Sequence, residues 1–158
     1  MKAEDQFHVG IVVDDLPAAL AALSQLFGYE WCAMFDGPLR VVLPAGTAEI
    51  PLRFVYSRHP PRVEVIQTIP GTLWVPAAGS GIHHLGYWSD DVAGDAAELE
   101  RWGFTAEATG TRPDGTPSWA FHRSRTGPRI ELVDRALRPG LEQMWATTLS
   151  PGQPMEGR

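Results

Sequence analysis

The sequence predicts an α+β fold made of two similar halves, each a strand, a helix and about three further strands. An internal repeat and a recurring switch between strand-like and helical patterns carry this prediction. The composition agrees with it, because 158 residues with 44% hydrophobic and 20% charged residues can bury a substantial core. No apolar run approaches the roughly 20 residues that a membrane span requires.

The internal repeat has an offset of 76 residues. Residues 8–16 (HVGIVVDDL) align with residues 84–92 (HLGYWSDDV), so that the His, the Gly and both Asp coincide. The offset slips by one residue at Gly28 and Gly103. Because the shared residues include turn formers and candidate ligands, we expect the two halves to have equivalent local structures.

Each half contains a helix with recognisable ends. Asp15 and Asp91 are suited to N-caps, and Gly28 and Gly103 to C-terminal stops. One apolar face is predicted for each helix, with Leu16, Leu20, Leu23 and Phe27 in the first and Val92, Ala96, Leu99 and Trp102 in the second.

Strand-like runs follow each helix and are separated by Gly and Pro. They fall at about 29–35, 38–44, 50–57 and 62–68, and at about 104–109, 117–122 and 128–134. We therefore divide the chain into a first module (5–70), a second module (80–134) and a C-terminal segment (135–158), within one structural domain overall. The C-terminal segment is predicted to hold a short helix from Leu141 to Leu149 and a flexible tail from Ser150 to Arg158.

Four polar side chains are predicted to share one face of the sheet. Alternation along the first strand turns His8 away from Val9 and Ile11, and the repeat makes His84 its equivalent. In the last strand of each half, Glu64 and Glu131 each lie between two branched apolar residues. Two imidazoles and two carboxylates suit one divalent ion (Co, Ni, Mn, Zn or Fe) and leave positions for water or substrate.

The remaining histidines, tryptophans and the cysteine have other predicted roles. His83 adjoins His84 and is assigned to packing or to support of the ligands, whereas His122 is expected at the surface. Trp88 shares the alternation of His84 and would line the cavity. Other aromatic residues are expected in the core: Trp31, Trp74, Trp102, Trp119 and Trp145. Cys32 is expected to be packed and inert.

The formal charge of −6 disfavours binding to nucleic acid or to an anionic membrane. Arg53, Arg58 and Arg62 lie close together in sequence and form either a solvated face or a patch that attracts an anion. The single cysteine excludes an intrachain disulfide, and the polar start of the chain is unlike a signal peptide, so a cytoplasmic location is expected.

At three segments the sequence resembles the vicinal oxygen chelate superfamily, the glyoxalase/bleomycin resistance/dioxygenase group. The segments are residues 7–13 (FHVGIVV), 81–86 (GIHHLG) and 129–133 (RIELV), and residues 81–86 most resemble methylmalonyl-CoA epimerases. The resemblance covers about residues 5–134. It implies two βαβββ modules that form a curved eight-stranded mixed sheet around a metal site, often in a dimer.

The resemblance also implies roles for the four side chains. His8, Glu64, His84 and Glu131 match metal-ligand positions, and Glu131 is further implied to act as a base. Such epimerases take a second carboxylate from a strand of the first half, where this sequence reads Pro-Leu-Arg-Phe at 51–54. The nearest acid is Glu49, which the sequence does not place.

The predicted function is a metal-dependent isomerase or epimerase that removes a proton next to a metal-bound carbonyl, with Glu131 and Glu64 as catalytic carboxylates. The substrate is expected to be an acyl-CoA thioester or another carbonyl compound. Three alternatives stay open: a lactoylglutathione lyase with the same enolate chemistry, an extradiol-type dioxygenase using His8, His84 and Glu131 on Fe(II), and a metal-free binding or resistance protein. A homodimer is possible, although one chain carries all four ligands.

Overall fold

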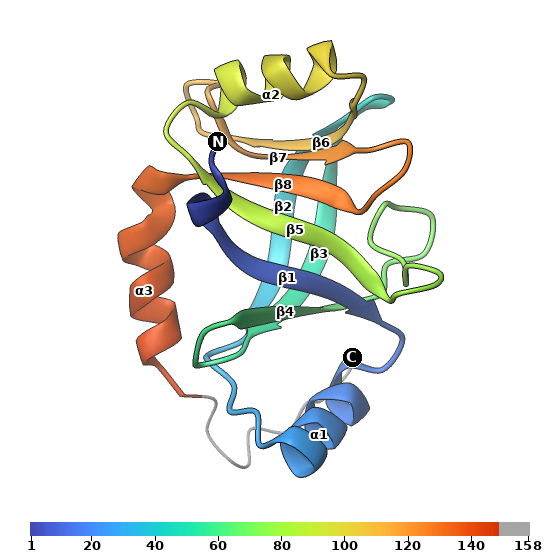
Figure 1. The fold of residues 1–158 in the computed structure, drawn as a ribbon, viewed down its shortest axis with the longest axis vertical. Coiled ribbons are helices and arrows are strands. Elements are labelled where there is room, and N and C mark those ends of the chain that lie inside the picture. The colour runs from blue at the N-terminus through green and yellow to red at the C-terminus, as the bar shows by residue number, and fades with distance from the viewer. Residues whose placement is uncertain (149–158) are drawn as a thin grey trace.

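The computed structural model describes residues 1–148, and its strands form one closed barrel. The elements are β1 (Gln6–Val13), α1 (Leu16–Phe27), β2 (Phe35–Leu43), β3 (Gly46–Tyr56), β4 (Arg62–Gln67), β5 (Ile82–Ser89), α2 (Val92–Arg101), β6 (Thr105–Thr111), β7 (Pro117–Arg123), β8 (Arg129–Asp134) and α3 (Arg138–Ala146). The strand order is β1-β4-β3-β2-β6-β7-β8-β5. The predicted α+β class with an eight-stranded mixed sheet is confirmed, and the sheet closes on itself (Figure 1).

The two halves contact each other along two seams. β1 pairs with β5 in antiparallel fashion, and β2 pairs with β6. Within each half the first strand pairs in parallel with the last, β1 with β4 and β5 with β8. This pairing places the first and last strands of both halves side by side in the order β4-β1-β5-β8 (Figure 1).

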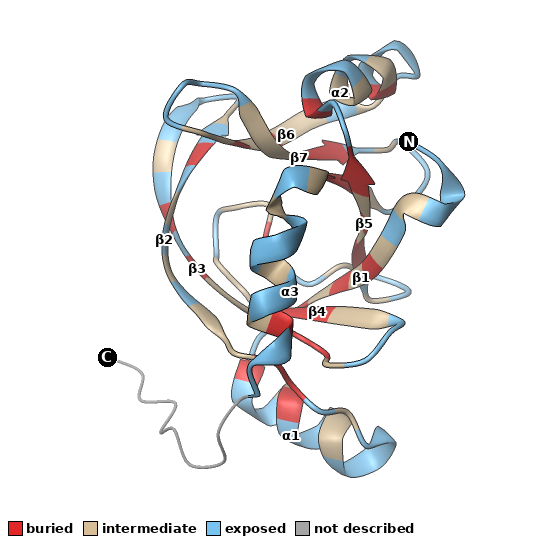
Figure 2. Ribbon diagram, turned by 90° about the vertical axis from the view of Figure 1, so that its left-hand side faces the viewer, coloured by how far each residue is buried: buried red, intermediate tan, exposed pale blue. Residues whose placement is uncertain are grey.

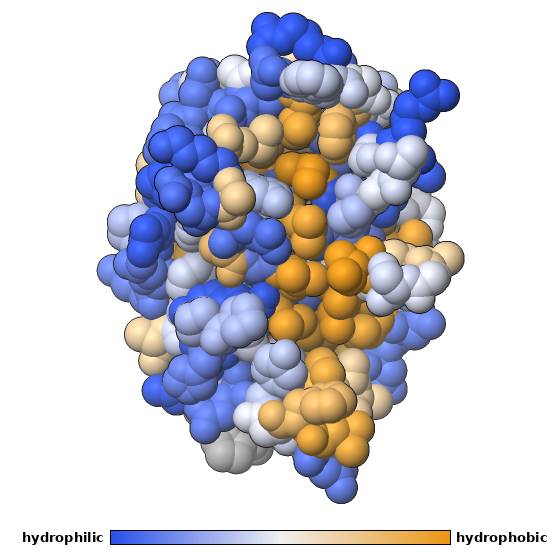
Figure 3. All heavy atoms as spheres, viewed as in Figure 1, coloured by the Kyte–Doolittle hydropathy of each residue, from blue (hydrophilic) through white to orange (hydrophobic). Residues whose placement is uncertain are grey.

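The helices α1 and α2 lie outside the barrel on opposite sides of it (Figure 1). Asp15 and Asp91 cap them as predicted, accepting hydrogen bonds from the backbone N–H groups of Ala18 and Gly94 at 2.9 and 3.0 Å. Gly28 ends α1 in the left-handed conformation, with φ of 72°. Between the helices, half-buried apolar side chains of β1 and β5 form part of an apolar band on the surface (Figure 3).

The apolar faces of both helices are shorter than predicted. Leu16 and Leu20 pack on Val55 and Val65, but Phe27 in the last turn is 71% exposed. Trp102 is 77% exposed, because α2 ends at Arg101 and the indole lies along the helix, donating a hydrogen bond to Glu98. The prediction of a core position for Trp102 is therefore wrong.

Two further boundaries differ from the predictions. Residues 29–34, predicted as part of a strand, form only isolated β-bridges at Trp31 and Cys32. The next strand, β2, begins at Phe35. The indole of Trp31 instead donates hydrogen bonds to Leu20 O and Ser24 Oγ beneath α1. The C-terminal helix begins at Arg138, three residues early, with a proline in its first turn. Leu149 and the tail predicted from Ser150 lie outside the described residues.

Helix α3 crosses one end of the barrel (Figure 2). Trp145 of this helix packs with Tyr56, Trp88 and Val133, and the Arg62 guanidinium lies 4.0 Å from the centre of its ring. None of the helices within residues 1–148 is both long and apolar enough to cross a membrane.

Candidate metal centre

Two glycines of the repeat bring the functional residues together on the adjoining strands. Gly10 of β1 lies opposite Glu64 of β4 on one side and opposite His84 of β5 on the other. The second half repeats the arrangement with Gly86, Glu131 and His8. Each glycine thus lies between a glutamate of its own half and a histidine of the other half.

The missing side chains of these glycines provide the space for the imidazoles. A Cβ atom at Gly10 would lie 1.8 Å from Cε1 of His84, and one at Gly86 would lie 1.9 Å from Cε1 of His8. Real Cβ atoms do not approach other atoms so closely. The coincident glycines of the repeat are therefore cradles in which each half holds the histidine ring of the other.

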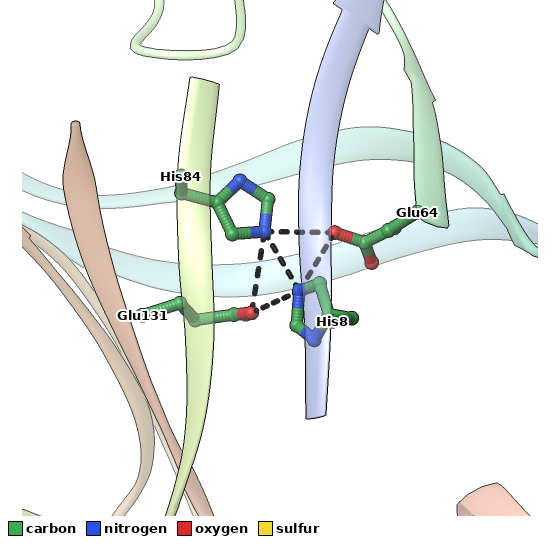
Figure 4. A group of neighbouring side chains, drawn as sticks. All are labelled: His8, Glu64, His84 and Glu131. Carbon is green, nitrogen blue, oxygen red and sulfur yellow. Dashed lines mark hydrogen bonds and ion pairs between the residues drawn. The ribbon is translucent and has the colours of Figure 1, made fainter. Parts of the chain in front are cut away.

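The four predicted side chains converge inside the barrel (Figure 4). One ligand atom from each of His8, Glu64, His84 and Glu131 lies within 4.8 Å of the other three. The Nε2 atoms of the two histidines are 2.8 Å apart. Each histidine Nε2 is 3.1 Å from the carboxylate of the opposite half, His8 from Glu131 and His84 from Glu64.

The chemistry of this group fits a divalent cation. All four residues are at most 8% exposed, and two carboxylate oxygens, Glu64 Oε2 and Glu131 Oε2, have no hydrogen-bond partner of good geometry among the described residues. Burying two carboxylates is costly unless a cation or several donors compensate for the lost hydration. The residues could therefore hold a divalent metal ion through two nitrogen and two oxygen donors.

In the metal-free protein the four groups form a charged network. Burial opposes protonation of His8, but interactions with Glu131 and Glu64 outweigh it and raise the pKa of His8 to about 9. Burial likewise opposes ionisation of Glu64 and Glu131, yet the two histidines hold the pKa of both carboxyls below the ordinary value. The pKa of His84 is raised for the same reason as that of His8. At neutral pH a proton thus occupies His8, and metal uptake would release it.

His83 fixes the tautomer of His84 through a chain of hydrogen bonds. Its Nε2 lies 2.8 Å from the carbonyl oxygen of Leu73, which can only accept, so Nε2 carries the proton. Burial lowers the pKa of His83 to about 4, so the ring is neutral and its Nδ1 is an acceptor. This Nδ1 lies 3.0 Å from Nδ1 of His84, which must therefore donate. When His84 is neutral, its Nε2 lone pair faces the centre, as a metal ligand requires.

The equivalent support is absent in the first half. Residue 7 corresponds to residue 83 in the repeat and is Phe7, whose ring stacks on Trp88 at 3.9 Å. Nδ1 of His8 has no hydrogen-bond partner among the described residues. The two histidines thus occupy equivalent places but differ in what holds their rings.

A cavity of about 110 Å³ adjoins the metal centre, and we call it the barrel chamber. Both carboxylates line it, together with Tyr56 and a wall of aromatic and aliphatic side chains that includes Trp74, Trp119 and Phe121. Leu137 and Leu141 line it on the side of α3. It leaves room for a small molecule next to the two carboxylates.

The chamber residues were mostly missed by sequence reasoning. Tyr56 is 4% exposed and lies opposite Glu64 in the β3–β4 pairing. Burial, then the charges of Glu64 and Glu131, raise the pKa of Tyr56 well above its usual value. The pairing register of β3 and β4 places Tyr56 opposite Glu64. The sequence of the loop between the two strands does not specify that register.

Three sequence-based placements need correction or completion. His122 is buried, 1% exposed, rather than at the surface; it lies on β7 beneath α2, with its Nε2 3.6 Å from Glu100. Trp88 packs against Phe7 and Trp145, and it lines a second cavity together with His8 rather than the barrel chamber. Glu49 is exposed on β3, whereas Leu52 of the same strand lines the chamber, so β3 supplies no carboxylate to it.

Comparison with known proteins agrees with this architecture. Residues 7–122 match the family described as the glyoxalase/bleomycin resistance protein/dioxygenase superfamily, and the chain belongs to this superfamily. No protein of curated function matches the chain by sequence.

Several solved structures share the fold. A methylmalonyl-CoA epimerase variant from Streptomyces coelicolor, in complex with 2-nitronate-propionyl-CoA, is 19% identical with a TM-score of 0.56, over 84% of this chain and 97% of the epimerase. The methylmalonyl-CoA epimerase from Mycobacterium tuberculosis is 17% identical with a TM-score of 0.57, over 87% and 91% of the two chains. A 4-hydroxymandelate synthase variant from Streptomyces coelicolor is 24% identical with a TM-score of 0.55, over 82% of this chain and 38% of the synthase.

Proposed function

We propose that this protein is a divalent-metal-dependent enzyme that moves a proton on the carbon next to a carbonyl group, as an isomerase or epimerase does. The observation that carries the proposal is the convergence of two imidazoles and two carboxylates within 4.8 Å, next to a cavity. Superfamily membership supports it, as does the shared fold with methylmalonyl-CoA epimerases.

The proposed ligands are His8, Glu64, His84 and Glu131. The ion, when bound, supplies a Lewis acid for the carbonyl oxygen of the substrate. His83 holds His84 in the tautomer that leaves Nε2 free, and the two glycine cradles fix both rings. The identity of the ion is left to experiment, since this donor set accepts Co, Ni, Mn, Zn or Fe.

The proposed proton carriers are the two carboxylates. Glu131 takes the proton from the carbon next to the carbonyl, leaving the electron pair of the broken C–H bond in the enolate. Glu64, from the other half of the barrel, is the proposed second carboxylate: it takes up a proton from water and delivers it to the enolate carbon, and the proton on Glu131 then returns to water. Apolar walls around the reacting carbon keep water from quenching the enolate.

Exchange of the α-proton with solvent tests this proposal. In D2O, the metal-loaded protein is expected to replace the α-hydrogen of a carbonyl substrate with deuterium. Proton NMR measures this exchange for propionyl-CoA, methylmalonyl-CoA and small hydroxyketones. Glu131→Gln is expected to lower the exchange rate by about 100-fold or more, since general-base removal typically costs about 10²–10⁴. Glu49→Gln, an exposed acid on β3, is the matched control and should leave the rate unchanged.

An unchanged rate in Glu131→Gln that still holds metal would exclude Glu131 as the base. No exchange on any substrate by metal-loaded protein would refute the proposed function. Ring cleavage of a catechol by the Fe(II)-loaded protein would favour the dioxygenase alternative instead.

A cytoplasmic location and a homodimer are further parts of the proposal. The free, buried Cys32 is compatible with a reducing compartment. The apolar band between α1 and α2 would suit a second copy of the chain, and sedimentation of the purified protein would test this.

A further inference from the structure

The lining of the barrel chamber differs from what a charged substrate would need. Within residues 1–148, the polar side chains that line it are Tyr56, Glu64 and Glu131, and the other lining residues are Leu, Ile, Val, Phe or Trp. No lysine or arginine side chain lines the chamber in this part of the chain. An anionic group that entered it would lose its hydration without gaining a counter-charge.

The metal does not supply the missing positive charge. Both chamber acids, Glu64 and Glu131, are proposed ligands, and a carboxyl group binds a metal ion in its deprotonated form. Two carboxylates balance the charge of a divalent ion. The filled centre is therefore neutral overall, and it offers a substrate a Lewis-acid position rather than a net attraction for anions.

The candidate arginines are engaged elsewhere. Arg53 pairs with Asp36 at 3.2 Å, and Arg58 donates a hydrogen bond to Thr148. Arg62 lies over Trp145 and donates to the carbonyl oxygens of Ser57 and Arg58. None of the three lines the chamber.

The walls match a flat ring. Trp74, Trp119 and Phe121 meet edge to face, with centroid distances from 5.8 to 6.5 Å. The cavity of about 110 Å³ is on the scale of the apolar cavity of about 150 Å³ that holds one benzene molecule. An aromatic or similar compact apolar group would bury its surface against these side chains.

From these observations we infer that the part of the substrate that enters the barrel chamber is uncharged and apolar, with the size of one ring, and that it presents its carbonyl to the four ligands. This inference rests on the proposed function for the position of the carbonyl. It narrows the substrate class to neutral aryl or compact alkyl carbonyl compounds. It disfavours substrates that carry a carboxylate near the reacting carbon.

Calorimetric binding of four matched ligands tests the inference without relying on turnover. All carry the same hydroxyketone group: hydroxyacetone, 2-hydroxyacetophenone, and 2-hydroxyacetophenone with a para-nitro or a para-carboxylate substituent. We expect the phenyl compound to bind at least tenfold more tightly than hydroxyacetone. We expect the carboxylate to bind at least tenfold more weakly than the nitro compound, its uncharged isostere.

Each outcome bears on the inference. If hydroxyacetone binds as tightly as 2-hydroxyacetophenone, the ring is not bound in the chamber. If none of the four ligands binds, the inference is likewise overturned. A carboxylate that equals its nitro isostere would overturn the part concerning charge. Failure of the proposed function is distinguishable from failure of this inference. In that case the metal-loaded protein shows no α-proton exchange, but the four ligands still bind in the expected order of affinity.

A pair of leucine variants locates the effect. Leu141→Lys places an ammonium at the α3 side of the chamber, at a half-buried position from which a lysine can reach solvent, and should raise the affinity for the carboxylate compound about tenfold. Leu26→Lys, on the exposed side of α1, should leave all four affinities unchanged. Equal behaviour of the two variants, with metal content and circular dichroism as in the wild type, would contradict the assignment of binding to the chamber.

Discussion

The first and second halves of the barrel contribute the same donors to the metal centre but support them differently. Each half gives one histidine, one glutamate and one glycine cradle. In the second half His83 connects His84 to a backbone carbonyl, whereas in the first half the corresponding residue is Phe7, and His8 Nδ1 is unpaired among the described residues. The metal donors and the glycine cradles are thus shared by the two repeats, whereas the hydrogen-bond chain that orients a histidine occurs only in the second.

The glycine cradles should show the largest effect. Gly10→Ala and Gly86→Ala each place a methyl group within 2 Å of a histidine ring, so the ring must leave its place. We expect a loss of metal affinity of about 100-fold or more in both variants, measured by titration against a chelating dye.

Gly37→Ala is the control for these variants. A Cβ at Gly37 would meet only the ring of Phe35 at 3.8 Å, an ordinary contact, so the change should be neutral or slightly stabilising. Wild-type metal affinity in either cradle variant would break the proposed equivalence of the two halves.

The pH dependence of metal binding should be the next largest effect. Because the pKa of His8 in the metal-free protein is about 9, the metal must displace a proton below that pH. Affinity should therefore rise about tenfold per pH unit from pH 7 towards pH 9 for each proton released. Calorimetry in buffers of different ionisation enthalpy counts the protons, and zero released protons at pH 7 would contradict the charged network.

The stability of the metal-free protein should fall as pH rises from 7 towards 9, whereas metal affinity rises. A raised histidine pKa stabilises the fold fully below the ordinary value of about 6.5, and this contribution is lost as pH rises through about 9. The lowered pKa values of the two glutamates stabilise it above about pH 4.5, and this contribution is lost on acidification. The lowered pKa of His83 adds a loss of stability as pH falls below about 6.5. Thermal melting should thus be highest near about pH 6.5, and a maximum above pH 9 would be inconsistent with these shifts.

The support of His84 should have a smaller effect. His83→Phe makes the second half resemble the first, and it should lower metal affinity by about 10- to 100-fold, the usual cost of removing a partner of a metal-bound histidine. His122→Phe is the matched control, since it replaces another buried histidine that is not among the ligands, and it should bind metal normally. Equal affinities in both variants would show that the hydrogen-bond chain does not orient His84.

The smallest effect is expected at the end of α1. Phe27→Ala should change the free energy of unfolding by no more than about 0.5 kcal/mol, because the ring is 71% exposed. Leu20→Ala, at a buried position of the same helix, should cost about 2–4 kcal/mol. Urea unfolding of both variants measures the difference, and similar losses would show that Phe27 is buried in solution.

The repeat is the reason that much of the centre could be predicted from the sequence. It identified Asp15 and Asp91 as caps, and its register selected His84 over His83. It could not predict that Gly10 and Gly86 make room for the rings, because that depends on cross-strand register. The burial of His122 and the exposure of Trp102 depend on where α2 ends and on what it covers, which local periodicity does not specify.

The chamber was less accessible to sequence reasoning for a similar reason. Its walls combine strands of both halves with Trp74 from a loop and Leu141 from α3. Their meeting depends on closure of the barrel, which no local pattern encodes.

Metal stoichiometry tests the central claim most directly. After dialysis against mixed divalent ions, the wild-type protein and a His84→Ala, Glu131→Ala double variant are analysed by inductively coupled plasma mass spectrometry. We predict about one ion per wild-type chain and none in the variant, with both proteins folded by circular dichroism. A wild-type chain without metal, or a variant that keeps its ion, would contradict the assignment of His8, Glu64, His84 and Glu131 as a metal centre.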